Sequence, residues 1–297
     1  MSELWTYVNG AWTPQKQAAL PLHDAGFVLG ATVTDLCRTI RHKLFHWHEH
    51  LARFRESCRL ARIPLRKTDD EISAIADELL RRNTPNLPLE QDLSLVLIAT
   101  PGLIGYYIGQ PGGPGDAEPF FCLYAYPLPH HRYRPWWRDG VSLVTPEIRH
   151  VPPETLSRQI KHRSRLFWWI AEQEMKQMDH EAQALLLDTD GSLTETASAN
   201  FLLVKKGQVL SPRRERILHG VTLQVVEDLC RREGIPFKET DLQLKDMETA
   251  QEAFLTSTTY CLAPVRRVNE AEFPVPGLIY DRIRAAWNRV AGGTVIP

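Results

Sequence analysis

The chain of 297 residues lacks the features that mark several classes of protein. It has five cysteines and no Cys-x-x-Cys pair, which argues against a disulfide scaffold or a zinc site and suits a reducing compartment. Lys and Arg number 35 against 36 Asp and Glu, so no excess charge favours nucleic acid or an acidic membrane surface. No apolar run reaches the roughly 18 residues of a membrane span, and the first residues do not resemble a secretory signal. We expect a cytoplasmic protein with no nucleic-acid, membrane or metal partner.

The composition that remains is that of an ordinary globular enzyme, with 43% apolar and 24% charged residues. A length near 300 residues suits two domains. Strand and helix patterns are mixed along the chain, which predicts a two-domain α/β (α+β) protein. We place an N-terminal domain at 1–126, a proline-containing linker at 127–135 and a C-terminal domain at 136–297.

Several local signals predict individual elements. Asn9-Gly10 between two short apolar runs indicates a hairpin turn. Thr68 followed by Glu71 has the spacing of a capping box and predicts a helix through residue 80. Gly234 is placed to end a helix over residues 222–232, because glycine adopts the left-handed conformation without strain. A further helix is expected at about 164–178.

Three polar segments are not explained by a purely structural role. Segment 160–165 reads Ile-Lys-His-Arg-Ser-Arg at the expected start of a helix, where positive charge opposes the helix dipole. Neighbouring positive charges lower the pKa of a lysine, and Schiff-base chemistry requires such a lysine. A solvated basic patch is an equal alternative for this segment. Four hydroxyl residues at 256–259 follow an apolar strand, and 219–222 opens a helix whose amides favour phosphate. Together they indicate pyridoxal 5′-phosphate.

At these segments the chain resembles the class IV (fold type IV) pyridoxal-phosphate enzymes, a group of branched-chain aminotransferases, D-amino acid aminotransferases and aminodeoxychorismate lyase. The N-terminal half carries Asp24-x-Gly26-Phe27-x-x-Gly30 and then His50-Leu51-Ala52-Arg53. The C-terminal half carries, in the order of the family, Ile160-Lys161, the block at 193–200, the block at 217–222 and Phe254-Leu255-Thr256-Ser257-Thr258. The resemblance implies a homodimer with the cofactor between the two domains.

The resemblance also implies roles for individual residues. Lys161, in the C-terminal domain, is similar to the lysine that holds the cofactor covalently and moves the proton. Glu195 is similar to the carboxylate that keeps the pyridine nitrogen protonated, so that the ring accepts electrons. The residues implied to bind the cofactor phosphate are Arg53, Val221, Thr222, Ser257 and Thr258.

The substrate side departs from the family. Thr34 stands where D-amino acid aminotransferases have an aromatic residue, and Pro101 stands where many members have an arginine that holds the substrate carboxylate. The candidates to replace that arginine are Arg38 and, beside Lys161, Arg163 or Arg165. Alternation along a strand puts Arg38 on the same face as Thr34, so Arg38 is the better candidate for binding the substrate carboxylate. The alternative is that Arg38 only forms a structural ion pair with a neighbouring residue.

We therefore predict an aminotransferase that moves an amino group from an amino acid or amine to a 2-oxo acid through a pyridoxamine intermediate. The alternative within the family is a lyase of the aminodeoxychorismate type, which uses the same cofactor and lysine to eliminate pyruvate. A non-catalytic binding module is the alternative from a different class, and the presence of Lys161, Glu195 and Arg53 together argues against it.

Overall fold

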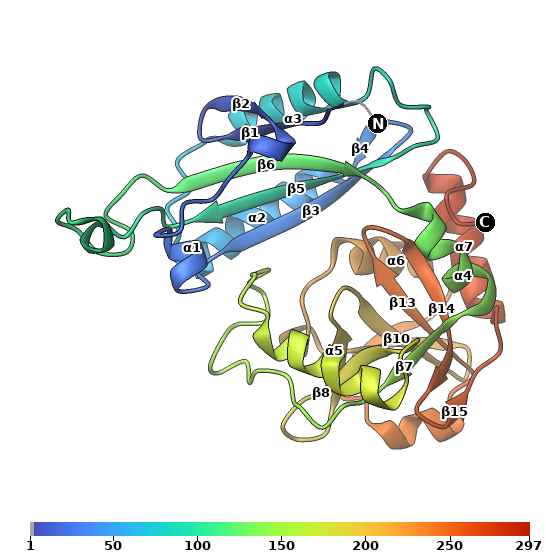
Figure 1. Ribbon diagram of the computed structural model, residues 1–297. Helices are drawn as coiled ribbons and strands as arrows, with labels where there is room; N and C mark the ends of the chain where they lie inside the picture. Colours follow the sequence, from blue (N-terminus) through green and yellow to red (C-terminus); the bar gives the residue numbers. More distant parts are fainter. Residues whose placement is uncertain (1–2) are drawn as a thin grey trace. The chain divides into compact units, whose positions relative to one another are not determined.

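The computed structural model describes residues 3–297 (Figure 1). The chain forms two compact units, of which the first runs up to Leu128 and also includes Ile160–Ser164. The second consists of Pro129–Gln159 and Arg165–Pro297. The change between units at Leu128 falls inside the segment 127–135 that we predicted as a linker. Lys161 lies in the first unit and not in the second as expected, because residues 160–164 pair with a strand of the first unit.

The first unit is a sheet with helices on one face. Its strands are β1 (Trp5–Val8), β2 (Ala11–Pro14), β3 (Val33–Ile40), β4 (Lys43–Phe45), β5 (Leu93–Thr100) and β6 (Phe120–Pro127). Its helices are α1 (Ala25–Val28), α2 (Trp47–Leu60) and α3 (Asp69–Asn83), with short 3-10 turns η1 (Gln15–Gln17) and η2 (Gly105–Ile108). The strand order is β2-β1-β6-β5-β3-β4, and the neighbouring strands are antiparallel (Figure 1).

Alternation along the strands decides which face of this sheet is apolar. In β3, Val33 and Cys37 belong to the buried core with Leu51 and Phe54 of α2, so the odd-numbered residues of β3 face the helices. Thr34 and the other even-numbered residues face the opposite side. Two local predictions are confirmed here, since Asn9-Gly10 forms the β1–β2 turn and the capping box forms at the start of α3.

The second unit contains the remaining elements. Its strands are β7 (Val141–Val144), β8 (Gln183–Leu187), β9 (Leu193–Thr196), β10 (Asn200–Lys205), β11 (Gln208–Pro212), β12 (Phe237–Thr240), β13 (Glu252–Ser257), β14 (Cys261–Val268) and β15 (Ala271–Glu272). Its helices are α4 (His130–Asp139), α5 (Leu166–Met178), α6 (Val221–Arg232) and α7 (Leu278–Val290), with 3-10 turns η3 (Arg214–Arg216) and η4 (Leu244–Thr249).

Six strands of the second unit, β10-β13-β14-β7-β8-β9, form a closed circuit, and β11, β12 and β15 lie outside it. The sheet runs β12-β11-β10-β13-β14-β7-β8-β9, and β9 pairs again with β10. The pair that closes this circuit is Glu195 of β9 with Asn200 of β10. The closure therefore places a predicted cofactor residue at a fixed point of the sheet.

Two helices of the second unit show where local signals succeed and where they fail. The predicted helix over 222–232 is confirmed as α6, with Gly234 at a φ of +66° after its end. Residues from His130 onward, predicted as linker, instead form α4, and Pro135 lies inside this helix. The prolines suggested an extended segment, but Tyr133 and Trp137 of α4 are buried, and this packing outweighs the local cost of Pro135.

Among the described residues, no helix has both the length and the apolar composition needed to cross a membrane.

Candidate active site

Helix α2 carries a polar face in the first unit. His50, Arg53 and Ser57 recur every three to four residues, so they lie on one face of the helix. All three contact residues that come from distant parts of the sequence. The sequence motif pointed to Arg53, whereas it assigned no role to His50 or Ser57.

Asp35, on the helix-facing side of β3, is the partner of two of these side chains. Its carboxylate is fully buried, and it accepts hydrogen bonds from Arg53 Nε at 2.8 Å, Arg53 Nη2 at 2.9 Å and His50 Nδ1 at 2.8 Å. Burial alone would raise the pKa of Asp35, but the Arg53 guanidinium and the His50 hydrogen bond outweigh burial and hold this pKa well below its ordinary value. Arg53 is thus held as a charged, oriented group.

Lys161 lies in an extended segment and not at the start of a helix. Its amide nitrogen donates to Ser57 Oγ at 3.1 Å, and its carbonyl oxygen accepts from the amide of Thr34 at 2.8 Å. Helix α5 begins only at Leu166, with Arg165 as its N-cap residue. The predicted conflict between Lys161 and a helix dipole is therefore wrong, because pairing with β3 keeps the lysine segment extended.

The three predicted substrate residues have different surroundings. Arg38 has a relative exposure of 1% and forms an ion pair with Asp92, with Nη2 2.9 Å from Oδ2. Arg163 is exposed, and its Nη2 lies 3.4 Å from Thr34 Oγ1. Thr34 and Arg38 do face the same side of β3, but the buried pairing of Arg38 favours the structural alternative that the sequence left open.

In the second unit, Glu195 is buried and accepts hydrogen bonds from neutral donors. Oε2 accepts from Asn200 Nδ2 at 2.9 Å, and Oε1 accepts from the amide of Leu218 at 3.0 Å. His150 Nε2 lies 3.8 Å from Oε1. Among the described residues, no lysine or arginine forms an ion pair with Glu195 within 4.0 Å. Burying a carboxylate without a cationic partner costs folding free energy, and carboxylates buried in this way are typical of functional sites.

Asn200 connects Glu195 to the start of α6. Its Nδ2 also donates to the carbonyl oxygen of Leu218 at 2.9 Å. Gly220, the N-cap residue of α6, approaches Asn200 so closely that an added Cβ would lie 2.1 Å from Asn200 Oδ1. Sequence reasoning placed Asn200 in a family motif but missed this role. Its signal was the position of an amide residue at the start of an apolar strand.

The predicted phosphate-binding residues of this unit lie at two element ends. Val221 and Thr222 are the first residues of α6, a helix with no side-chain cap and no acidic residue in its first turn. Ser257 ends β13, and Thr258 begins the turn that follows. Unpaired amides in the first turn of a helix attract anions.

A buried hydroxyl supports the fit of an additional polar group here. Thr256 pairs with Asn200 in adjacent strands, so the side chains of the two residues share one face of the sheet. Thr256 Oγ1 is buried and has no hydrogen-bond partner among the described residues. Together with the uncapped start of α6, this orphaned donor fits an anionic ligand that the described residues do not supply.

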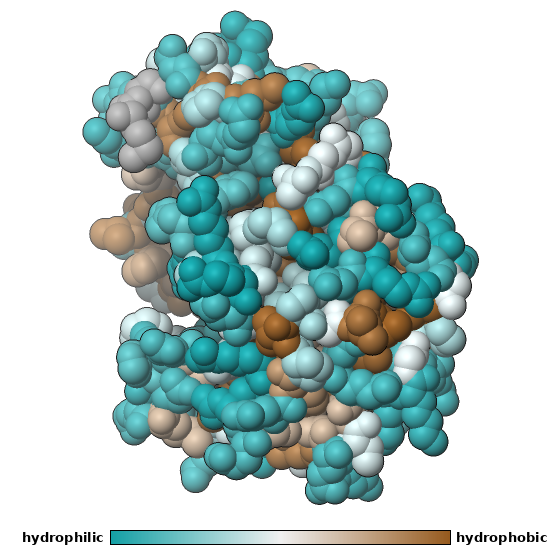
Figure 2. All heavy atoms as spheres, turned by 90° about the vertical axis from the view of Figure 1, so that its right-hand side faces the viewer, coloured by the Kyte–Doolittle hydropathy of each residue, from teal (hydrophilic) through white to brown (hydrophobic). Residues whose placement is uncertain are grey.

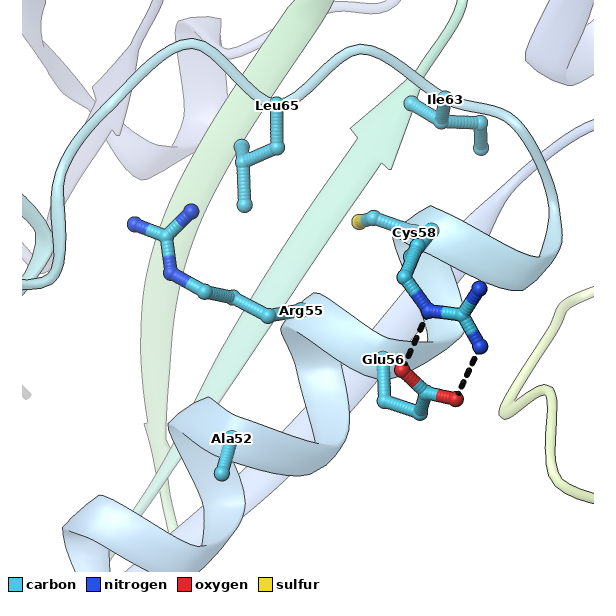
Figure 3. A pocket seen from close by; sticks show the side chains of 7 residues that line it. Ala52, Arg55, Glu56, Cys58, Ile63 and Leu65 are labelled. Atoms are coloured by element: carbon cyan, nitrogen blue, oxygen red, sulfur yellow. Dashed lines mark hydrogen bonds and ion pairs between the residues drawn. The ribbon is translucent and has the colours of Figure 1, made fainter.

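A shallow pocket on α2 is a separate feature (Figure 3). Its lining residues are Ala52, Arg55, Glu56, Cys58, Arg59, Ile63 and Leu65. Of these lining residues, Ala52, Arg55, Glu56 and Arg59 lie on the side of α2 opposite to the polar face that carries Arg53. Glu56 already pairs with Arg59, as the dashed lines in Figure 3 show. We therefore do not assign this pocket to the site.

Comparisons with known proteins support the family predicted from the motifs. The family described as amino-transferase class IV matches residues 32–268. A putative branched-chain-amino-acid aminotransferase of Methanocaldococcus jannaschii is 29% identical over 266 residues, which cover 89% of this chain and 87% of the relative. A D-alanine aminotransferase of Listeria monocytogenes is 25% identical over 270 residues, covering 88% and 86%.

A solved structure supports the fold. The crystal structure of an aminotransferase from Brucella abortus bound to PLP has a TM-score of 0.83 and 24% identity, covering 98% of this chain and 100% of that chain. The predictions of an α/β fold type IV architecture, of aminotransferase activity and of pyridoxal phosphate as cofactor are confirmed, and the lyase alternative is not supported. Because the match spans most of its length, this chain belongs to the class IV aminotransferase family.

Proposed function

We propose that the chain transfers amino groups between amino acids and 2-oxo acids, with Lys161 as the residue that binds pyridoxal phosphate covalently. When bound, this cofactor supplies a carbonyl group for the amino group and a ring that accepts the electron pair of the broken C–H bond. The amine of Lys161 would remove the proton from the substrate Cα as general base and would deliver it to the cofactor carbon that receives the amino group, as general acid. Its backbone, fixed on both sides by Ser57 and Thr34, supports this precise task.

The buried carboxylate of Glu195 is the observation that carries the proposal. We assign to Glu195 the task of holding a proton at the pyridine nitrogen. Asn200 and the Leu218 amide fix the orientation of both carboxylate oxygens. Because these donors are neutral, the negative charge of Glu195 remains available to stabilise a positive ring nitrogen.

We assign the binding of the phosphate to the residues that the family motifs indicate, which are Arg53 and the polar groups at the start of α6 and the end of β13. Arg53 supplies charge, and its orientation by Asp35 reduces the conformational entropy lost on binding. Val221 and Thr222 supply amides at the start of α6, and Ser257 and Thr258 supply hydroxyl groups.

A homodimer in a reducing compartment, the cytoplasm, completes the proposal. All five cysteines are buried. Apolar side chains interrupt the hydrophilic surface in places (Figure 2). In the first unit they gather on α1, η2 and the segment before α1, where Leu22 is 71%, Phe27 66% and Tyr106 57% exposed. These segments are adjacent, because Ile104 donates a backbone hydrogen bond to His23, and large exposed apolar patches are typical of protein interfaces.

Reduction of the loaded protein with borohydride, followed by peptide mapping, tests the proposed role of Lys161. We expect a phosphopyridoxyl label on Lys161 and on no other lysine, and no label in Lys161→Ala. A panel of branched-chain and D-amino acid donors with several 2-oxo acids then tests turnover, because the relatives named above carry both substrate classes in their names. A label on a different lysine would reject the assignment. Light scattering of the purified protein tests the dimer, and a monomeric mass would reject it.

A further inference from the structure

The segment that contains Lys161 pairs with the start of β3 in antiparallel fashion. His162 and Val33 form a bridge, the Thr34 amide donates to the Lys161 carbonyl, and the Arg163 amide donates to the Thr32 carbonyl at 2.8 Å. In this pattern Lys161 lies opposite Thr34, and Arg163 lies opposite Thr32. Directly opposite residues point to the same side, and side chains alternate along a strand. Lys161, Arg163 and Thr34 therefore share one face, whereas Val33 points into the core.

This face is the side of the sheet away from α2 and α3. Leu123 of β6 belongs to the core under the helices, so its neighbour Tyr124 points to the opposite side. The charge of Arg163 acts on Tyr124, since it partly opposes the burial that raises the pKa of this phenol. The Arg163 side chain therefore lies on the face of the sheet away from α2 and α3, beside Thr34 and within electrostatic range of Tyr124.

Arg163 differs from Arg38 and Arg53 in its ion pairing. Arg38 is paired with Asp92, and Arg53 is paired with Asp35. Within residues 3–297, no carboxylate forms an ion pair with Arg163 within 4.0 Å, and its side chain is exposed. Thr34 Oγ1 donates to the carbonyl oxygen of Leu97 at 2.8 Å, which leaves a lone pair for the guanidinium at 3.4 Å. The guanidinium is thus oriented by a neutral hydroxyl group and not by a carboxylate.

We propose that Arg163 binds the carboxylate of the amino-acid substrate and that Thr34 positions its guanidinium. This inference rests on the proposed role of Lys161, which holds the reacting amino group on the same face. An arginine two residues after this lysine brings a planar two-point donor to the carboxylate of a substrate that reacts there.

The test compares ligands that differ only in the carboxylate. Pentanoate and pentanamide are titrated against the loaded enzyme by calorimetry, and L- and D-norvaline are compared with butylamine in half-reactions. In Arg163→Gln we expect the affinity for pentanoate to fall about tenfold to a hundredfold, with pentanamide and butylamine unchanged. Arg163→Lys keeps the charge without the two-point geometry and gives an intermediate loss. Thr34→Val weakens pentanoate binding less than Arg163→Gln does.

Arg66→Gln is the matched control, because Arg66 is an exposed arginine of the same unit that pairs with Glu118 on the surface. Unchanged pentanoate affinity in Arg163→Gln, or equal losses for pentanoate and pentanamide, would overturn the proposal. Borohydride labelling of Lys161 in Arg163→Gln keeps the two hypotheses distinct. A normal label with no carboxylate preference in the wild type rejects the role of Arg163 alone, whereas a missing label in the wild type rejects the role of Lys161.

Discussion

Asp35 and Arg53 meet at two points, with Arg53 Nε 2.8 Å from Oδ2 and Nη2 2.9 Å from Oδ1. They come from β3 and α2, and the carboxylate is completely buried. Such a pair fixes the plane of the guanidinium, which is the property that a phosphate-binding arginine needs. The position of Arg53 therefore depends on Asp35, although our proposal gives Asp35 no contact with the cofactor phosphate.

Replacing Arg53 or Asp35 tests two roles of the pair, which are cofactor binding and the stability of the fold. Arg53→Ala is expected to weaken pyridoxal phosphate binding about tenfold to a hundredfold. It should also lower the free energy of unfolding of the apoprotein by about 3–5 kcal/mol, because the buried Asp35 carboxylate loses its guanidinium partner. Asp35→Asn is expected to weaken binding less. Cofactor titration and urea unfolding measure both effects. Arg55→Ala on the opposite face of α2 is the control, and unchanged cofactor affinity in Arg53→Ala would contradict the assignment.

His50 makes the stability of the fold sensitive to mild acid. Burial lowers the pKa of His50, although the hydrogen bond to Asp35 opposes this effect. The folded protein therefore binds a proton at His50 less readily than the unfolded chain, in which histidine binds one below about pH 6.5. The free energy of unfolding should fall as the pH drops through this value. The contribution of Asp35, whose pKa is lowered, is lost only below about pH 4.

Urea unfolding between pH 5 and pH 8 checks this prediction. In His50→Asn, whose amide can still donate to Asp35, the loss of stability between pH 7 and pH 5 should be smaller than in the wild type. Equal slopes for the two proteins would show that another group is responsible.

Arg38→Ala should damage the fold and leave substrate preference intact. The change removes the ion-pair partner of the buried Asp92 carboxylate, whose remaining side-chain partner among residues 3–297 is the Thr39 hydroxyl at 3.0 Å. Breaking a buried ion pair costs about 3–5 kcal/mol, measurable by urea unfolding. The ratio of rates with norvaline and butylamine should not change. A selective loss with norvaline would restore Arg38 as the carboxylate-binding residue.

Gly220→Ala should disturb Glu195 without touching it. The new methyl group would lie 2.1 Å from Asn200 Oδ1, so the Asn200 side chain has to move away from Glu195. We expect slower half-reactions and weaker cofactor binding, measured by stopped-flow absorbance and titration. Gly293→Ala is the matched control, because no atom lies within 4 Å of a Cβ added there. Normal kinetics in Gly220→Ala would mean that Asn200 does not position Glu195.

Glu195→Gln should retain the cofactor and slow the half-reaction by about a hundredfold to a thousandfold. The neutral amide cannot stabilise a protonated ring nitrogen, and its NH2 group faces one of the two donors that now contact the carboxylate. Absorbance of the bound cofactor and single-turnover rates measure the two effects. The exposed Glu215→Gln should behave as the wild type. Near-normal rates in Glu195→Gln would assign the protonation of the ring to another group.

Local signals in the sequence were sufficient for much of the fold. The Asn9-Gly10 turn, the capping box at Thr68 and the glycine after α6 each depend on a few neighbouring residues, and all three form as predicted. The ordered motifs were sufficient for the family, because residues such as Lys161 and Glu195 are recognised by their place in the chain. Turns, helix caps and the order of motifs depend on residue types and their spacing, so the sequence alone is enough to predict them.

Tertiary structure decided which partner each charged residue has. Arg38, Arg53 and Arg163 have the same chemistry, and the sequence favoured Arg38 for a substrate because it faces the same side as Thr34. Pairing of distant segments instead placed Asp92 beside Arg38, Asp35 beside Arg53, and no carboxylate of the described chain within ion-pair distance of Arg163. The energy of a charge depends on its burial and on the groups around it, and for these residues both are set by contacts between segments far apart in sequence.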